Sequence, residues 1–191
     1  GGFFLNVNAV ARNRIARLEA DGSLDPTFTC SAADAVYCMQ IQPDGQILLG
    51  GQFATINGVA HQRVARINPD GSLDESFQSP VINGAVLSMA LQTNGQVLIG
   101  GNFTSVGDQS RGRIARLNSN GTLDEAFGDS PLIGTDNNVR AIVVEPGGRI
   151  IIGGDFEHVD GVQHRKIARL EGNGAVDNTF LNAELNGGVS A

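Results

Sequence analysis

The chain repeats itself four times, and this internal repetition constrains its fold more than any other feature. A Gly-Gly-x-Phe motif begins at Gly1, Gly50, Gly100 and Gly153, so the spacings are 49, 50 and 53 residues. Each motif is followed by an apolar-Ala-Arg-apolar segment, then by an Asp-Gly or Asn-Gly turn, and finally by an acid and a phenylalanine. Several motifs kept in phase over four copies cannot arise by chance, so the chain is a tandem array.

The array contains about 3.7 copies of a unit of about 50 residues. We expect residues 1–191 to form a single propeller domain or part of one, with approximate repeats 1–28 (a half), 29–77, 78–127, 128–180 and 181–191 (the start of the next). The last segment is assigned because Asn186 to Ala191 aligns with Asn83 to Ser88. The ends are out of phase and Gly1 is not preceded by Met. We therefore expect a fragment of a longer ring, or a subunit whose ends pair with those of another subunit.

Short apolar runs separated by turn residues predict β-strands in each unit. Residues Val86 to Gln92 and Gln96 to Ile99 flank Asn94-Gly95, and Asn-Gly between such runs favours a two-residue hairpin turn with positive φ at both central residues. The Ile-Ala-Arg-Leu segment predicts a third strand, and Ser-Leu-Asp-x-x-Phe predicts a shorter fourth strand. Helical apolar spacing does not persist anywhere, so the predicted fold class is all-β.

Four short antiparallel strands per unit predict a β-propeller built of four-stranded blades. A glycine doublet at the end of the second strand indicates a place where neighbouring backbones approach closely. The recurring phenylalanine would fill the space between blades. A β-solenoid is the alternative, although its coils are usually shorter than this unit.

Composition and motifs exclude several classes of function. The chain has 13 Lys and Arg against 20 Asp and Glu, a formal charge of −7, so we expect neither a nucleic-acid partner nor binding to an anionic membrane. No apolar run is long enough to insert across a bilayer. Nucleophile-elbow, phosphate-loop and zinc signatures are also missing from the sequence. We therefore expect no enzyme activity, no cofactor and no metal.

Each repeat carries two basic side chains just before the Ile-Ala-Arg-Leu segment. They form the pairs Arg12 and Arg14, His61 and Arg63, Arg111 and Arg113, and His164 and Lys166. The spacing of two places both side chains of a pair on one face if the segment is extended. Around a ring they would form a basic circlet, which suggests an anionic ligand such as an acidic glycan. The alternative is that these groups pair with acids of their own or a neighbouring blade.

A second charged pattern links an arginine to an aspartate eight residues later. The pairs are Arg17 and Asp25, Arg66 and Asp74, Arg116 and Asp124, and Arg169 and Asp177. A turn between the two residues would bring guanidinium and carboxylate together as a bidentate pair. We interpret this as a structural ion pair repeated once per blade.

The two cysteines, Cys30 and Cys38, lie eight residues apart in the second repeat. They are either free or buried thiols, or a local disulfide if the chain is extracellular.

The repeat resembles the delta-60 repeats, which are β-propeller units of large bacterial secreted and surface proteins. The resemblance is carried by the segment Gln46 to Phe77 and covers essentially the whole chain. It implies a propeller in an extracellular or cell-surface, non-catalytic setting, and it brings no established ligand. Two copies depart from the pattern, with Asn8-Ala9 in place of Asn57-Gly58 and Ala175-Val176 after Asn173-Gly174.

These observations lead us to expect a scaffold or interaction domain of a bacterial surface or secreted protein. One alternative is a self-assembling structural subunit that completes blades between copies, as a ring or a fibre. Another is a lectin-like glycan binder. The expected partners are a second copy or the remainder of a longer propeller chain, together with a glycan or protein ligand.

Overall fold

The computed structural model describes residues 1–128, 134–180, 185 and 187–190. All regular secondary structure in these ranges is β-strand, which confirms the predicted all-β class. Most of the expected beginning of another repeat, at 181–191, lies outside the described residues, because 181–184, 186 and 191 are not among them.

Each complete repeat forms a three-stranded antiparallel sheet from consecutive long strands. The strands are β3 (Val36–Ile41), β4 (Ile47–Gly51) and β7 (Val64–Ile67); β8 (Val86–Leu91), β9 (Val97–Gly101) and β12 (Ile114–Leu117); and β13 (Val139–Val144), β14 (Ile150–Gly154) and β17 (Ile167–Leu170). The predicted fourth strand is reduced to one bridge per repeat, such as Ile67 with Leu73. In the second repeat the segment does not continue as a strand, because the chain turns again directly after Leu73. The turn is closed by the Phe77 amide, which donates to the Asp74 carbonyl.

A small hairpin that the sequence analysis did not predict joins the second and third strands. In the second repeat it consists of β5 (Thr55–Ile56) and β6 (Val59–Ala60). Its counterparts are β1 (Asn6–Val7) and β2 (Val10–Ala11), β10 (Ser105–Val106) and β11 (Gln109–Ser110), and β15 (His158–Val159) and β16 (Val162–Gln163). Asn57 and Gly58 have φ of 50° and 80°. The two-residue turn with two positive φ values therefore occurs here.

The turn between the first two long strands differs from the one expected. Gly45 has φ of 85°, but Asp44 is not among the residues with positive φ. The Gly45 amide donates to the Gln42 carbonyl, and the Gln42 amide donates to the Gln46 carbonyl, which defines a three-residue loop ending in a left-handed glycine. The carboxylate of Asp44 accepts a hydrogen bond from the Gln46 amide at 3.0 Å, so the aspartate acts as a turn-forming side chain.

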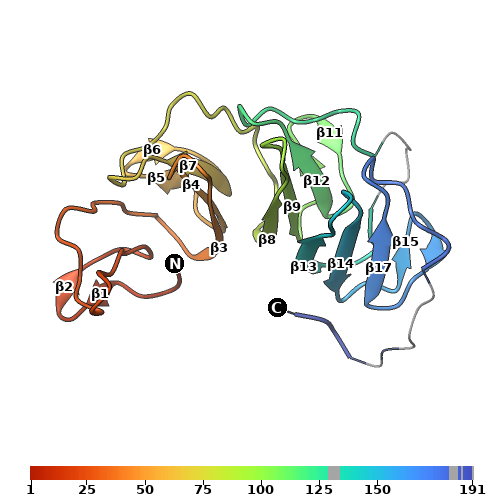
Figure 1. Ribbon diagram of the computed structural model, residues 1–191, viewed down its shortest axis with the longest axis horizontal. Helices are drawn as coiled ribbons and strands as arrows, with labels where there is room; N and C mark the ends of the chain where they lie inside the picture. The colour runs from red at the N-terminus through yellow and green to blue at the C-terminus, as the bar shows by residue number, and fades with distance from the viewer. Residues whose placement is uncertain (129–133, 181–184, 186, 191) are drawn as a thin grey trace.

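The repeats follow one another along an arc, and both termini lie on its open side (Figure 1). The first strands of successive sheets pack against one another, β3 against β8 and β8 against β13. The apolar core is therefore distributed between sheets: each of its three clusters joins side chains of two successive repeats. The phenylalanines Phe28, Phe53, Phe77, Phe103, Phe127 and Phe156 are fully buried in it.

The glycine doublet allows this close packing. A Cβ at Gly51 would overlap the carbonyl oxygen of Ala35, the residue just before the first strand of the same sheet. A Cβ at Gly50 would lie 2.9 Å from Val86 Cγ1 of the next repeat. Gly51 thus permits strand pairing within the sheet, and Gly50 permits packing between sheets. Both agree with the close backbone approach expected at the doublet.

Candidate functional site

The recurring arginine and aspartate meet in all four repeats. Arg66 lies on β7, and the tight turn at residues 68–72 returns the chain so that Asp74 lies beside it. The distance from Arg66 Nε to Asp74 Oδ2 is 2.7 Å. The equivalent distances in the other repeats are 2.6 Å for Arg17–Asp25, 2.7 Å for Arg116–Asp124 and 2.8 Å for Arg169–Asp177.

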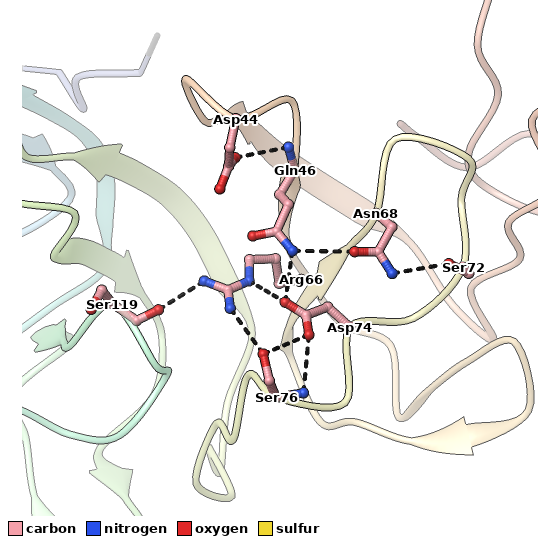
Figure 2. Close-up of polar contacts among 8 residues, drawn as sticks. All are labelled: Asp44, Gln46, Arg66, Asn68, Ser72, Asp74, Ser76 and Ser119. Atoms are coloured by element: carbon pink, nitrogen blue, oxygen red, sulfur yellow. Dashed lines mark hydrogen bonds and ion pairs between the residues drawn. The ribbon is translucent and has the colours of Figure 1, made fainter.

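The pairing is not the bidentate arrangement that the sequence suggested. Figure 2 shows that the two oxygens of Asp74 have different partners. Oδ2 accepts from Arg66 Nε and, at 2.9 Å, from Gln46 Nε2. Oδ1 accepts from the Ser76 amide at 3.0 Å and from the Ser76 hydroxyl at 2.7 Å. The carboxylate therefore joins the residue just before the second strand, the third strand and the following turn.

The rest of the guanidinium reaches into the next repeat. Arg66 Nη1 donates to the carbonyl oxygen of Ser119 at 2.8 Å, as Figure 2 also shows. Arg116 donates in the same way to Gly172, at 2.6 Å, and Arg17 donates to Pro69. We call the set formed by Arg66, Asp74, Phe77 and their counterparts the junction cluster.

The closing phenylalanine of each repeat completes this cluster. The Arg66 guanidinium carbon lies 4.9 Å from the centroid of the Phe77 ring, within the range of a cation–π interaction. The distances in the other repeats are between 4.7 and 4.9 Å. Each arginine therefore covers an aromatic ring and neutralises a carboxylate, and Arg17, Arg66 and Arg116 also bind the next repeat.

Hydrogen bonding keeps the cluster carboxylates ionised. Hydrogen bonds from Thr27 and then Arg17 lower the pKa of Asp25 from 3.8 to about 2, and those from Thr179 and then Arg169 do the same for Asp177. Burial raises the pKa of Asp74, but hydrogen bonds from Ser76 and Arg66 outweigh it and the pKa falls to about 2.

Sequence reasoning missed the neutral members of this network. Gln46 and Gln96 donate to the cluster aspartates of their repeats, each at 2.9 Å. A hydroxyl two residues after the aspartate is provided by Thr27, Ser76 and Thr179. Both patterns recur in the sequence, so aligning the polar positions of the repeats would have found them.

The second basic residue of each predicted pair has an unexpected backbone conformation. The φ values of Arg14, Arg63, Arg113 and Lys166 lie between 66° and 70°. The segment is therefore not extended, and the argument that spacing alone places both side chains on one face is wrong. These side chains instead donate to main-chain carbonyls. Arg14, Arg63 and Lys166 fold back to Phe3, Gln52 and Asp155 of their own repeats, and Arg113 donates to Thr135 of the next repeat.

The first basic residues lie partly or wholly inside the protein. Arg111 and His164 are buried, whereas Arg12 and His61 are half-buried. Arg12 and Arg111 each donate to the carbonyl of the preceding residue at 2.9 Å. In the fourth repeat, pairing with an acid of the same blade is seen, because Lys166 Nζ lies 2.6 Å from Glu157 Oε1.

A groove of about 490 Å³ lies between the first and second repeats. Its lining includes the side chains of Arg12, Asn13, Cys30, Ser31, Asn57 and Ser72. It is the place where one of the predicted ligand-binding residues, Arg12, borders a hollow in the surface.

Both cysteines are free thiols, so the disulfide alternative is not the one seen. Burial raises the pKa of Cys30 to about 11 and that of Cys38 to about 12. Neither is therefore ionised near neutral pH, which disfavours a nucleophilic role.

The described ranges contain no group of three or more histidine, cysteine or acidic residues that could hold a metal ion. In the same part of the chain, no helix has the length and apolar character needed to cross a membrane.

Antiparallel sheets that repeat along the chain, pack through shared apolar clusters and follow an arc define a β-propeller repeat protein. The family model described as a domain of unknown function (DUF5122) beta-propeller matches residues 1–28, 42–77, 92–127 and 145–180, which is more than half of the chain. The chain therefore belongs to this family.

A solved structure described as a protein of unknown function from Bacteroides caccae is 18% identical, with a TM-score of 0.36, and the match covers 84% of this chain and 72% of that one. No curated protein matches the sequence.

Proposed function

We propose that the chain is a non-catalytic β-propeller module that serves as a scaffold and interaction domain of a bacterial secreted or cell-surface protein. The proposal rests on the contacts that the recurring charged residues make. In every repeat the arginine and aspartate of the motif are engaged with each other, and in the first three the arginine also binds the next repeat. The recurring arginine and aspartate therefore have a structural role, and we expect the loops to contact partners.

The similarity of the motif to delta-60 repeats supports a location outside the cell. The test is fractionation of bacteria that produce the native parent protein, combined with protease treatment of intact cells. Release or cleavage of the propeller on intact cells is expected. Recovery from the cytosol alone, with protection on intact cells, would contradict the proposal.

Recognition of an anionic glycan is a second candidate function, favoured by the groove that Arg12 lines. Calorimetric titration with a short oligogalacturonate tests it. The expected result is binding by the native chain, loss of binding in Arg12→Ala, and unchanged binding in Arg165→Ala, which removes an exposed arginine from the fourth repeat. No binding by the native chain, or equal binding by Arg12→Ala, would remove this candidate.

A further inference from the structure

We propose that the third repeat carries a docking site for a basic side chain, lysine or arginine, of a partner protein. The site is a groove of about 280 Å³ where the chain passes from the second repeat to the third. The inference deepens the proposed function, on which it rests. It names the surface of the interaction domain that meets a partner, and the chemistry of that partner.

The third repeat departs from the repeat pattern at the hairpin beside this groove. The residues around the hairpin turn are Asn-Ala-Val at 8–10, Asn-Gly-Val at 57–59 and Asp-Gly-Val at 160–162, but Gly-Asp-Gln at 107–109. An acid and an amide therefore stand where the other copies have a small residue and a valine. The packing that the four copies share does not require this change.

The backbone of the same turn departs as well. In the second repeat, Asn57 and Gly58 both have positive φ. In the third repeat Gly107 has φ of 57°, whereas Asp108 is not among the residues with positive φ. Glycine at the first central position is typical of a type II′ turn, which needs positive φ only at that residue. Asp108 is thus held without backbone strain at the groove that it lines.

The lining of the groove combines apolar and acidic side chains. Its apolar members, Pro80, Val106 and Leu123, are half-buried or buried, and its acids, Asp108 and Glu125, are exposed. A long basic side chain lays its methylene stem on apolar surface and keeps its charged end in contact with water. The lining therefore matches both parts of a lysine or arginine side chain.

Both carboxylates are available to such a partner. Within the described ranges, the side chains of Asp108 and Glu125 take part in no ion pair or hydrogen bond. By contrast, Asp74, Asp136 and Asp155 are each paired with a basic side chain of their own repeat or the adjoining loop. An incoming cation would not have to displace an internal partner.

The size of the groove favours one side chain over a whole small molecule. Its volume of about 280 Å³ lies just below the range of roughly 300–1,000 Å³ that is typical of small-molecule pockets. The formal charge of −7 also favours approach of a basic partner. The occupant is therefore one basic residue of a segment that lies across the junction.

The groove at the preceding junction has the opposite charge. It is built from equivalent positions, since Asn57 and Ser72 there correspond to Gly107 and Thr122 here. Arg12 lines that groove, and none of the described residues that line it is an acid. The first groove thus repels a basic side chain and the second attracts one, which gives the array a charge pattern that a partner can read.

The test is a titration followed by proton–nitrogen correlation NMR at low ionic strength. The probe is a short peptide with blocked ends that contains one lysine among glycines and alanines. A matched peptide carries norleucine, which keeps the stem and lacks the ammonium group. The lysine peptide is expected to shift the amide signals of Gly107, Asp108 and Leu123, and the norleucine peptide is expected to leave them in place.

A pair of double variants tests the two carboxylates. Asp108→Asn with Glu125→Gln removes both charges and keeps the shape of the groove, and binding is expected to weaken about five- to tenfold. Asp44→Asn with Glu75→Gln is the matched control, because it removes the same net charge from exposed residues outside the groove. The control is expected to bind the lysine peptide as the native chain does.

Three outcomes would overturn the proposal. They are a native chain whose signals do not respond to the lysine peptide, equal binding by the native chain and the groove variant, and equal binding of the lysine and norleucine peptides. Butylammonium that bound as tightly as the peptide would assign the groove to a small amine and overturn the protein partner. Failure of the titration would leave the fractionation result unaffected, so the two proposals fail separately.

Discussion

Arg66 and Ser119 belong to successive repeats, and the guanidinium of Arg66 donates a 2.8 Å hydrogen bond to the main-chain carbonyl of Ser119. The same guanidinium neutralises Asp74 and covers the ring of Phe77. One side chain thus stabilises its own repeat and the junction with the next. Stability in such an array is the sum of repeat and nearest-neighbour contributions, so the junction cluster affects both.

The substitution Asp74→Ala is expected to destabilise the fold by roughly 1–3 kcal/mol, because it removes several hydrogen bonds to a buried charge and leaves Arg66 without its carboxylate. Urea unfolding measures the change. The control is Glu75→Ala, which removes an exposed acid next to it. Equal stability of the two variants would contradict the structural role of the ion pair.

Stability is expected to decline in acid. The pKa values of Asp25, Asp74 and Asp177 are about 2 in the folded chain, against an ordinary value of 3.8. The unfolded chain therefore takes up protons first, and the stabilisation is present above about pH 4 and lost as the pH falls toward 2. The free energy of unfolding measured from pH 5 to pH 2 checks this. Asp74→Asn should show a shallower decline, and an identical slope would count against the shift at Asp74.

Gly51→Ala is expected to destabilise the second repeat by about 1–3 kcal/mol, since its Cβ would overlap the Ala35 carbonyl and force β3 away from β4. Gly2→Ala changes the same position of the first repeat, where the nearest atom is Phe4 Cδ1 at 3.4 Å, and should be tolerated. Thermal unfolding at low protein concentration compares the two variants. A larger loss in Gly2→Ala would show that the paired strand is not the cause.

Ala9→Gly is expected to stabilise the chain by about 0.5–1 kcal/mol. Ala9 has φ of 64° in the turn between β1 and β2, a conformation that glycine adopts without steric cost. Ala60→Gly, at an exposed strand residue, is the control and should be neutral or destabilising. Thermal melts of both variants decide the point, and a lower melting temperature for Ala9→Gly would exclude strain at this turn.

The repeat motif was sufficient to predict the all-β class, the three long strands of each blade and the contact between Arg66 and Asp74, whereas the predicted fourth strand is only a single bridge. Each of these depends on local spacing: apolar runs identify strands, and a turn of fixed length brings back a residue eight positions later. The hairpin of β5 and β6 was missed because its strands have two residues each, too short for an alternating pattern to be visible. The left-handed backbone at Arg63 was missed because a basic residue gives no signal of positive φ.

By itself the sequence determined the repeating unit, its strands and the pairing of charges within it, because those features follow from neighbours along the chain. Tertiary structure decided what each charged group does between units. Only the packing of one sheet on the next shows that Arg66 reaches Ser119 and that Gly50 makes room for Val86. The physical reason is that contacts between repeats depend on the rotation from one sheet to the next, and residue spacing within a repeat does not encode that rotation.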